Sequence, residues 1–185
     1  MTGETRELLD LDNSVFMNFK RYTKQDVANC FEADMRASNF ENVISDEQEL
    51  SFCASVFEEN YATYCQAFHE ISAQFDHFPL IKLTDLAEVL YSLGIFAREK
   101  AKPISERVIK VYRDNVAAEN AEQSGLKKIL DEEEEELFNR VQFAEVLLLV
   151  IKADHEDSSH FSFNRELRIM FKEHITPFMN VKEPD

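Results

Sequence analysis

Glycine and proline are scarce in this chain of 185 residues. It contains only three glycines, at positions 3, 94 and 125, and four prolines. All-β folds need glycine at tight turns, and phosphate-binding loops need it where the backbone approaches the ligand. The motifs G-x-G-x-x-G and G-x-x-x-x-G-K-[ST] cannot be formed from these positions, so the standard nucleotide-binding motifs are excluded. We therefore expect helices joined by polar loops.

Cysteine and long apolar runs are scarce as well. Cys30, Cys53 and Cys65 are odd in number and show no C-x-x-C spacing, which favours reduced thiols in an intracellular protein. The N-terminal region carries acids and no apolar signal segment, and no stretch reaches the roughly 18 apolar residues of a bilayer span. We expect a soluble, cytoplasmic protein.

Positive charge is the third shortage. The chain has 20 Lys and Arg residues against 36 Asp and Glu residues, which gives a formal net charge of −16 at pH 7. Such a surface repels nucleic-acid phosphates and anionic lipid headgroups, so we expect neither a nucleic-acid nor a membrane partner. A basic protein, in particular a basic amphipathic helix, is the partner that this charge favours.

Apolar side chains, in contrast, are plentiful. The hydrophobic fraction is 44% and includes sixteen Phe, which is enough for a buried core in a chain of this length. Apolar residues recur at helical spacing in most windows, which predicts an all-α fold. The predicted helices cover about residues 23–37, 45–57, 60–75, 84–94, 105–112, 144–153 and 163–177.

Capping residues and prolines predict several helix boundaries. Thr23, Ser45 and Thr84 are suitable N-caps, because a hydroxyl oxygen can accept a free amide hydrogen of the first turn. Pro79 and Pro177 are expected to end helices, because proline has no amide hydrogen to donate. The stretch LIKL after Pro79 predicts a short extended piece.

The same pattern divides the chain into three regions. They are an N-terminal helical region at 1–59, for which a further helix–loop–helix unit is an alternative, a core at 60–155 with an acidic loop at 114–136, and a C-terminal helix and tail at 156–185. Linkers are predicted near 97–104 and 113–138, where the helical spacing is interrupted.

Two junctions between a short extended piece and an apolar helix look alike. They read IKLTDLAEVLYSLG from Ile81 and VQFAEV from Val141. Both resemble the second half of an EF-hand, a helix–loop–helix unit whose loop has an apolar β-bridge residue at its eighth position and usually Glu at its twelfth. In this alignment Ile81 and Val141 take the bridge position, and Asp85 and Glu145 take the twelfth.

The resemblance covers about residues 60–153. Apolar residues Leu86 and Val146 follow the twelfth positions, and Phe143 stands where the family often has Phe. The resemblance implies an all-α fold of paired EF-hand-like helix–loop–helix units with extra flanking helices. It also implies that Ile81 and Val141 pair in a two-residue β-ladder without a bound ion.

The acids that an EF-hand uses to bind calcium are incomplete. Calcium needs oxygen ligands at loop positions 1, 3, 5 and 12, with glycine at position 6. Asp76 is followed by a bulky His-Phe-Pro sequence, so Asp76, Asp85 and Glu145 remain only as isolated metal candidates. We expect no bound metal and no cofactor, although a calcium sensor stays open as an alternative.

A second calcium candidate lies near the N-terminus. Asp10, Asp12 and Ser14 have the 1, 3, 5 spacing, but Val15 replaces the required glycine and Arg21 falls at position 12. This departure from the motif argues against a site there.

Catalytic motifs are absent from the sequence. His155, Asp157 and His160 share a polar loop but lack a Cys pair or a helical H-E-x-x-H, and a solvated loop is the simpler interpretation. Cys65 and His69 are one helical turn apart beside apolar residues, which favours packing over nucleophilic chemistry. We expect no enzyme, with a small helical enzyme lacking a recognised motif as an alternative.

The resemblance implies a calmodulin-like or light-chain-like adaptor that binds a helical or cytoskeletal partner independently of calcium. Cytoskeletal assemblies, including cilia and axonemes, are the location that such subunits suggest. An apolar docking surface is predicted at Phe68, Phe75, Leu86, Leu90, Leu93 and Leu147. The acidic run is predicted to steer a basic partner through Glu132, Glu133, Glu134, Glu135 and Glu136.

Overall fold

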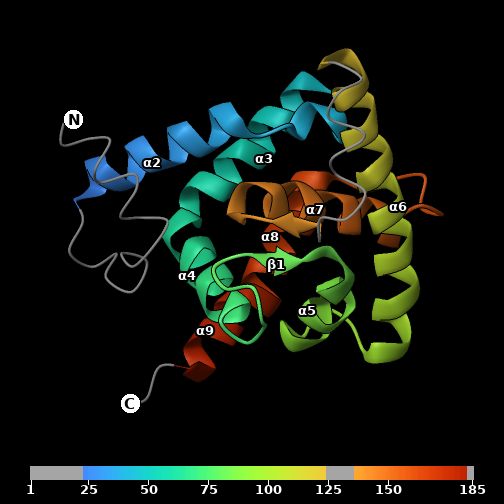
Figure 1. Ribbon diagram of the computed structural model, residues 1–185. Coiled ribbons are helices and arrows are strands. Elements are labelled where there is room, and N and C mark those ends of the chain that lie inside the picture. Colours follow the sequence, from blue (N-terminus) through green and yellow to red (C-terminus); the bar gives the residue numbers. More distant parts are fainter. Residues whose placement is uncertain (1–22, 124–135, 183–185) are drawn as a thin grey trace.

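Helices make up most of the structure (Figure 1). The computed structural model describes residues 23–123 and 136–182. Its elements are α2 (Lys24–Ala37), η2 (Phe40–Asn42), α3 (Glu47–Glu59), α4 (Tyr61–Ser72), β1 (Ile81–Lys82), η3 (Leu83–Asp85), α5 (Leu86–Ser92), α6 (Arg98–Gln123), β2 (Leu137–Phe138), α7 (Arg140–Asp154), α8 (Phe163–Met170), η5 (Phe171–Ile175) and α9 (Thr176–Lys182). The expected helical class is confirmed, with one two-stranded sheet among the described residues.

Capping side chains fix where the first helices begin. α2 starts after Thr23 with reciprocal hydrogen bonds, because the Asp26 N–H donates to the Thr23 hydroxyl (3.2 Å) and the Thr23 N–H donates to the Asp26 carboxylate (2.9 Å). The prediction that Ser45 caps α3 is wrong by one residue. Asp46 is the cap, and its carboxylate accepts the Glu49 N–H at 2.8 Å. A carboxylate serves the positive end of the helix better than a hydroxyl.

The first predicted linker is wrong. The linker expected near 97–104 is part of α6, which includes Pro103. Pro103 is the sixth residue of α6, where the missing amide hydrogen costs one hydrogen bond of the helix, and the residues Ala101 and Ile104 near it are buried in the core. α6 also extends to Gln123, into the second expected linker, while residues 124–135 lie outside the described part of the chain.

Pro177 does not end a helix, as had been expected. It lies in α9, directly after the π turn η5. The wide turn, in which the Thr176 N–H reaches the Phe171 carbonyl, precedes the proline. A wider turn makes room for the proline ring, which would clash with a carbonyl of a regular α-helix. Thr84, expected to cap a helix, lies instead within the 3-10 turn η3 that leads into α5.

The short extended pieces meet, but in a different register from the one expected. β1 and β2 are antiparallel, and Ile81 faces Phe138 while Lys82 faces Leu137. The Leu83 N–H continues the ladder to the Glu136 carbonyl at 2.8 Å. The predicted partner Val141 is wrong, because it lies in the first turn of α7. The helix begins earlier than expected, so the extended residues precede it.

α7 forms the centre of the core. Every residue from Phe143 to Ile151 is buried, including the charged Glu145. A helix that is apolar on all sides has to be covered on all sides. α6, α8, α2 and β2 all contact it, and Figure 1 shows it in the middle of the molecule. No helix of the described residues is long and apolar enough to cross a membrane.

Candidate functional site

The C-terminal helical run α8–η5–α9 packs across α3, α4 and α7. Its buried side chains are Leu167, Met170, Phe171 and Ile175. The Phe171 ring meets Phe57 of α3 and Tyr64 of α4 edge to face, with centroid separations of 5.7 and 6.3 Å. Edge-to-face contacts between buried rings add specificity to the area that they bury. We call this run the C-terminal helix.

The π turn decides which side chains the C-terminal helix buries. A π turn holds more residues than an α turn, and so it changes which residues continue the apolar stripe. Ile175 is buried, at 1% exposure, whereas His174 is only half-buried. His174 lines a cavity instead.

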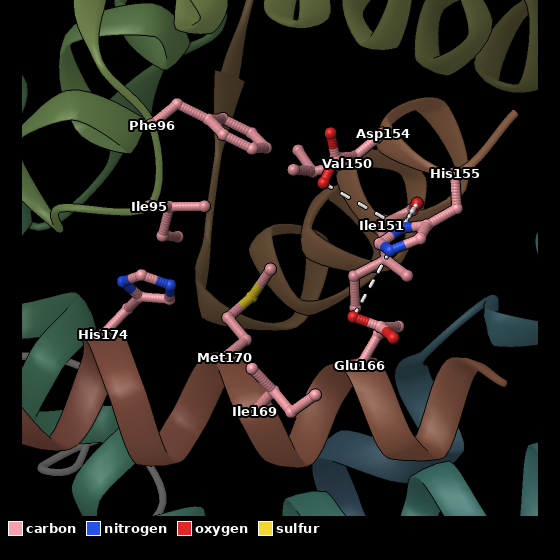
Figure 2. Close-up of a pocket in the computed structure, with 10 residues that line it drawn as sticks. All are labelled: Ile95, Phe96, Val150, Ile151, Asp154, His155, Glu166, Ile169, Met170 and His174. Carbon is pink, nitrogen blue, oxygen red and sulfur yellow. Dashed lines mark hydrogen bonds and ion pairs between the residues drawn. The ribbon is translucent and has the colours of Figure 1, made fainter. Parts of the chain in front are cut away.

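That cavity has a volume of about 180 Å³ and lies between the C-terminal helix, α7 and the connection from α5 to α6. Figure 2 shows Ile95 and Phe96 of the connection on one side and Met170 and His174 on the C-terminal helix. The C-terminal helix therefore leaves part of this space unfilled.

The polar side of the cavity is built from contacts between polar and charged side chains. His155 lies 3.3 Å from Glu166 through Nε2, and its Nδ1 is 3.0 Å from the Ile151 carbonyl. Asp154 pairs with Lys100 at 2.8 Å. His155 therefore contacts Glu166 and the backbone of α7. Asp157 and His160 of the same loop are exposed. Within the described residues, no cluster of three or more His, Cys, Asp or Glu is arranged to hold a metal ion.

Polar contacts fix the start of the C-terminal helix. The Glu49 carboxylate accepts hydrogen bonds from the Ser162 hydroxyl (3.1 Å), the Asn164 N–H (2.8 Å) and the Asn164 side-chain amide (3.0 Å). Further along, Arg168 pairs with Glu59 at 3.0 Å, and both side chains are more than half exposed. An exposed pair of this kind contributes little to stability.

A second and larger groove, of about 760 Å³, lies between α6, α7 and the segments that precede α3 and α8. We call it the α6–α7 groove. Its apolar lining is Val43, Ile44, Val108, Val111, Leu149, Phe161 and Phe163. Its polar lining includes Lys110, Lys152 and an ion pair of Arg107 with Glu156 at 3.0 Å. Val111 is 43% exposed, so apolar surface is accessible there.

A buried ion pair ties α2 to α7. Arg140 donates two hydrogen bonds to Asp34, at 2.7 and 2.9 Å, and the Tyr61 hydroxyl donates to the same carboxylate at 2.8 Å. The Tyr64 hydroxyl donates to the Arg140 carbonyl. Burial lowers the pKa of Arg140, but the hydrogen bonds and charge of Asp34 outweigh it and raise that pKa above its ordinary value. Arg140 therefore stays charged.

Sequence reasoning missed this pair. Asp34 and Arg140 are separated by 106 positions, and no local pattern joins them. The one available signal was an arginine at the start of an otherwise apolar helix, because a buried charge needs a partner.

The predicted docking residues belong mainly to the core. Five of the six, namely Phe68, Leu86, Leu90, Leu93 and Leu147, are buried, and Phe75 is half-buried. A docking role for these side chains would require the molecule to open. Of the acidic strip, Glu136 is exposed and pairs with Arg113 at 2.8 Å, and Glu132, Glu133, Glu134 and Glu135 lie outside the described residues.

The isolated metal candidates do not come together. Asp76 is exposed and Asp85 half-buried in the first junction, whereas Glu145 is buried within α7. Burial, together with the charges of Glu119 and Glu41, raises the pKa of Glu145 to about 7. Asp10, Asp12 and Ser14 lie outside the described residues. Cys65 is buried, and burial raises the pKa of its thiol, which opposes a nucleophilic role.

Comparisons with known proteins give no relative. No family model matches the chain, and no curated protein or solved structure matches it significantly.

Proposed function

We propose that the chain is a non-enzymatic, EF-hand-like adaptor that binds a helical partner protein without calcium. The carrying observation is the two-residue link between β1 and β2, in which Ile81 faces Phe138. Each strand lies between helices, in the orders α4–β1–α5 and α6–β2–α7. Two helix–loop–helix units joined by a short antiparallel link are the arrangement that the resemblance implies.

In this proposal the first loop keeps its length and the carboxylates of Asp76 and Asp85 at positions 3 and 12, but it has lost the rest of the calcium motif. With Ile81 at the eighth position, the loop runs from Gln74 to Asp85. Phe78 then occupies position 5, where calcium needs an oxygen ligand, and Pro79 occupies position 6, where glycine is needed. The link between the units therefore depends on side-chain packing and backbone hydrogen bonds.

The second loop is aligned by Phe138 rather than by Val141. Counting from Phe138 puts Gln142 at position 12 and Phe143 at the apolar position after it. The Gln142 side-chain oxygen accepts the Asn139 N–H at 2.9 Å, so this amide serves as a helix cap. An uncharged amide is a weaker calcium ligand than the two-oxygen carboxylate of an EF-hand.

The α6–α7 groove is the surface that we assign to the partner. The apolar surface that a partner can reach there is the exposed Val111 of α6 with the half-buried Phe161 and Phe163, while Val108 and Leu149, which also line the groove, are buried. Amphipathic helices bind in grooves of this type through side chains spaced by one turn. The net charge of −16 favours a basic partner through long-range attraction. A helix of a cytoskeletal protein fits these properties.

The proposal is tested by affinity purification of the full chain from its own cells with two matched variants. Val111→Glu places a charge in the α6–α7 groove at an exposed position, and Phe52→Glu places one on the exposed face of α3, at 48% exposure. We expect Val111→Glu to lose a co-purifying protein that the wild type and Phe52→Glu retain, because a charge in an apolar groove is costly to desolvate. Equal recovery with all three chains would contradict the proposal.

A further inference from the structure

We propose that Glu145 is a proton-dependent latch, which holds the second half of α6, residues 112–123, against α7 and η2. With a proton on Glu145 this half of α6 stays docked, and without the proton it opens to solvent. The latch does not depend on a partner protein. Only its effect on the α6–α7 groove, to which α6 contributes one wall, rests on the proposed function.

Glu145 is a buried acid without a polar partner. It is 5% exposed, and no hydrogen bond or ion pair joins it to another residue of the described ranges 23–123 and 136–182. An isolated carboxylate is costly to bury, whereas a neutral carboxyl group is tolerated much better. The docked arrangement of α6 and α7 therefore favours the protonated form of Glu145.

Like charges lie on two neighbouring elements. Burial, followed by the charges of Glu119 on α6 and Glu41 at η2, raises the pKa of Glu145 to about 7. Tyr112 of α6 stays neutral, because burial and the charges of Glu145, Glu119 and Glu136 raise its pKa to about 12. Other ionisable groups beside α7 make contacts of their own: Arg140 with Asp34, Asp154 with Lys100, and His155 with Glu166.

The second half of α6 is weakly attached to the core. The first half is held by buried side chains that include Ile104 and Val108, and Tyr112 is 7% exposed. From 113 to 119, in contrast, no residue is buried. The side-chain nitrogen of Asn115 is buried without a hydrogen-bond partner, which costs free energy in the docked state. A helix end of this kind opens locally at a lower free energy than global unfolding requires.

The polar contacts of this half of α6 lie near the surface. The Asn42 side-chain amide donates to the Glu119 carboxylate at 2.6 Å, where Asn42 is exposed. Arg113 pairs with Glu136 at 2.8 Å, and both side chains are about half exposed. Exposed contacts contribute little to stability. The protonation of Glu145 can therefore decide whether this half stays docked.

The size of the effect follows from the two pKa values of Glu145. In the opened form Glu145 reaches water, and its pKa returns to the ordinary value of 4.5 from about 7. Opening then releases a proton, so the ratio of opened to docked molecules rises with pH. Between pH 6 and pH 8 this ratio increases by about tenfold.

Opening also changes the α6–α7 groove. Val111 and Asp114 of α6 line the groove and lie on either side of Tyr112 in the sequence. Val43 and Ile44, which follow η2, line it as well. The latch is therefore expected to weaken the binding of a partner in this groove as the pH rises from 6 to 8.

The test is amide hydrogen exchange of the full chain under native conditions, corrected for the intrinsic rate at each pH. In the wild type we expect residues 113–119 to be about tenfold less protected at pH 8 than at pH 6. Low urea should leave their exchange unchanged, because local opening exposes little surface. Glu145→Gln cannot ionise and should show equal protection at the two pH values. Glu106→Gln, at an exposed position of the first half of α6, is the matched control and should behave like the wild type.

The latch is overturned if the wild type and Glu145→Gln show the same pH dependence. It is equally overturned if residues 113–119 exchange only as slowly as α7, because they would then open only by global unfolding. Should Glu145→Gln fail to fold, Glu119→Gln replaces it, and a pH change as large as in the wild type would overturn the latch.

Recovery of the cellular partner at pH 6 and pH 8 is a separate measurement. Equal recovery would remove only the effect on the groove, whereas the Val111→Glu variant tests the groove itself.

Discussion

At the scale of single residues, a few buried polar groups carry large energies. The Asp34–Arg140 pair has side chains that are 16% and 10% exposed, and it joins α2 to the start of α7. Removal of one partner leaves an uncompensated buried charge, which costs more than the pair contributes when it is intact.

We expect Asp34→Ala to lower the free energy of unfolding by about 3–5 kcal/mol. The matched control is Glu32→Ala, which removes the exposed pair with Arg36 at 3.6 Å and should cost at most about 0.5 kcal/mol. Urea denaturation measures both free energies of unfolding, provided that the dependence of the free energy on urea concentration has the same slope in each variant. Similar losses for the two variants would show that Arg140 finds water or another partner once Asp34 is gone.

Glu145 predicts a pH dependence. Its pKa is about 7 in the folded protein, against 4.5 as the ordinary value, because it is buried and faces Glu119 and Glu41. A raised pKa means that the folded state favours the proton. The stability is therefore full below pH 4.5 and is lost as the pH rises through 7, by up to about 3 kcal/mol.

We expect Glu145→Gln to gain stability over the wild type at pH 8 and to match it near pH 5. Thermal unfolding at the two pH values measures the change, and Glu106→Gln at an exposed position of α6 is the control. Parallel pH profiles for the wild type and Glu145→Gln would rule out this role for Glu145.

At the scale of elements, the two-stranded link and the helix ends decide the register. Helical spacing located α2 to within one residue, because Thr23 and Asp26 form a local capping box that the sequence displays. The start of α7 was placed too late, because Asn139 with Gln142 also forms such a box and was overlooked. The linker at 97–104 and the helix end at Pro177 were wrong because burial of neighbouring side chains keeps α6 helical through Pro103, and a wide turn precedes Pro177.

The register predicts that Phe138 contributes more to stability than Val141. Phe138 is 1% exposed beneath the link and stacks on Phe143 with a centroid separation of 5.6 Å, whereas Val141 is half-buried in α7. We expect Phe138→Ala to cost about 3–5 kcal/mol of unfolding free energy and Val141→Ala roughly 1 kcal/mol or less. Chemical denaturation measures the unfolding free energy of both variants. A larger loss for Val141→Ala than for Phe138→Ala would contradict the register in which Ile81 faces Phe138.

At the scale of the whole molecule, a large negative net charge does not by itself make a calcium site. An acidic chain attracts calcium weakly at many points, whereas an EF-hand binds it through a built cage. Phe78 and Pro79 occupy cage positions in the first proposed loop, and Gln142 replaces the carboxylate of the second.

We therefore expect calorimetric titration with calcium at 0.15 M salt, where weak surface attraction is screened, to give no saturable isotherm. Melting temperatures with calcium and with a chelator should also agree, because a ligand that binds only the folded state would stabilise it. A saturable isotherm reversed by chelator would favour the alternative of a calcium sensor.

The sequence by itself determined the helical class, most helix positions and the acidic character, because periodicity, capping and charge are local properties of the chain. It also indicated the two junctions at Ile81 and near residue 140. Only the tertiary structure decided that Ile81 meets Phe138, that Asp34 meets Arg140, and that the C-terminal helix covers α3, α4 and α7. These are contacts between distant segments, and their choice depends on which surfaces bury the most apolar area together. No local pattern contains that information.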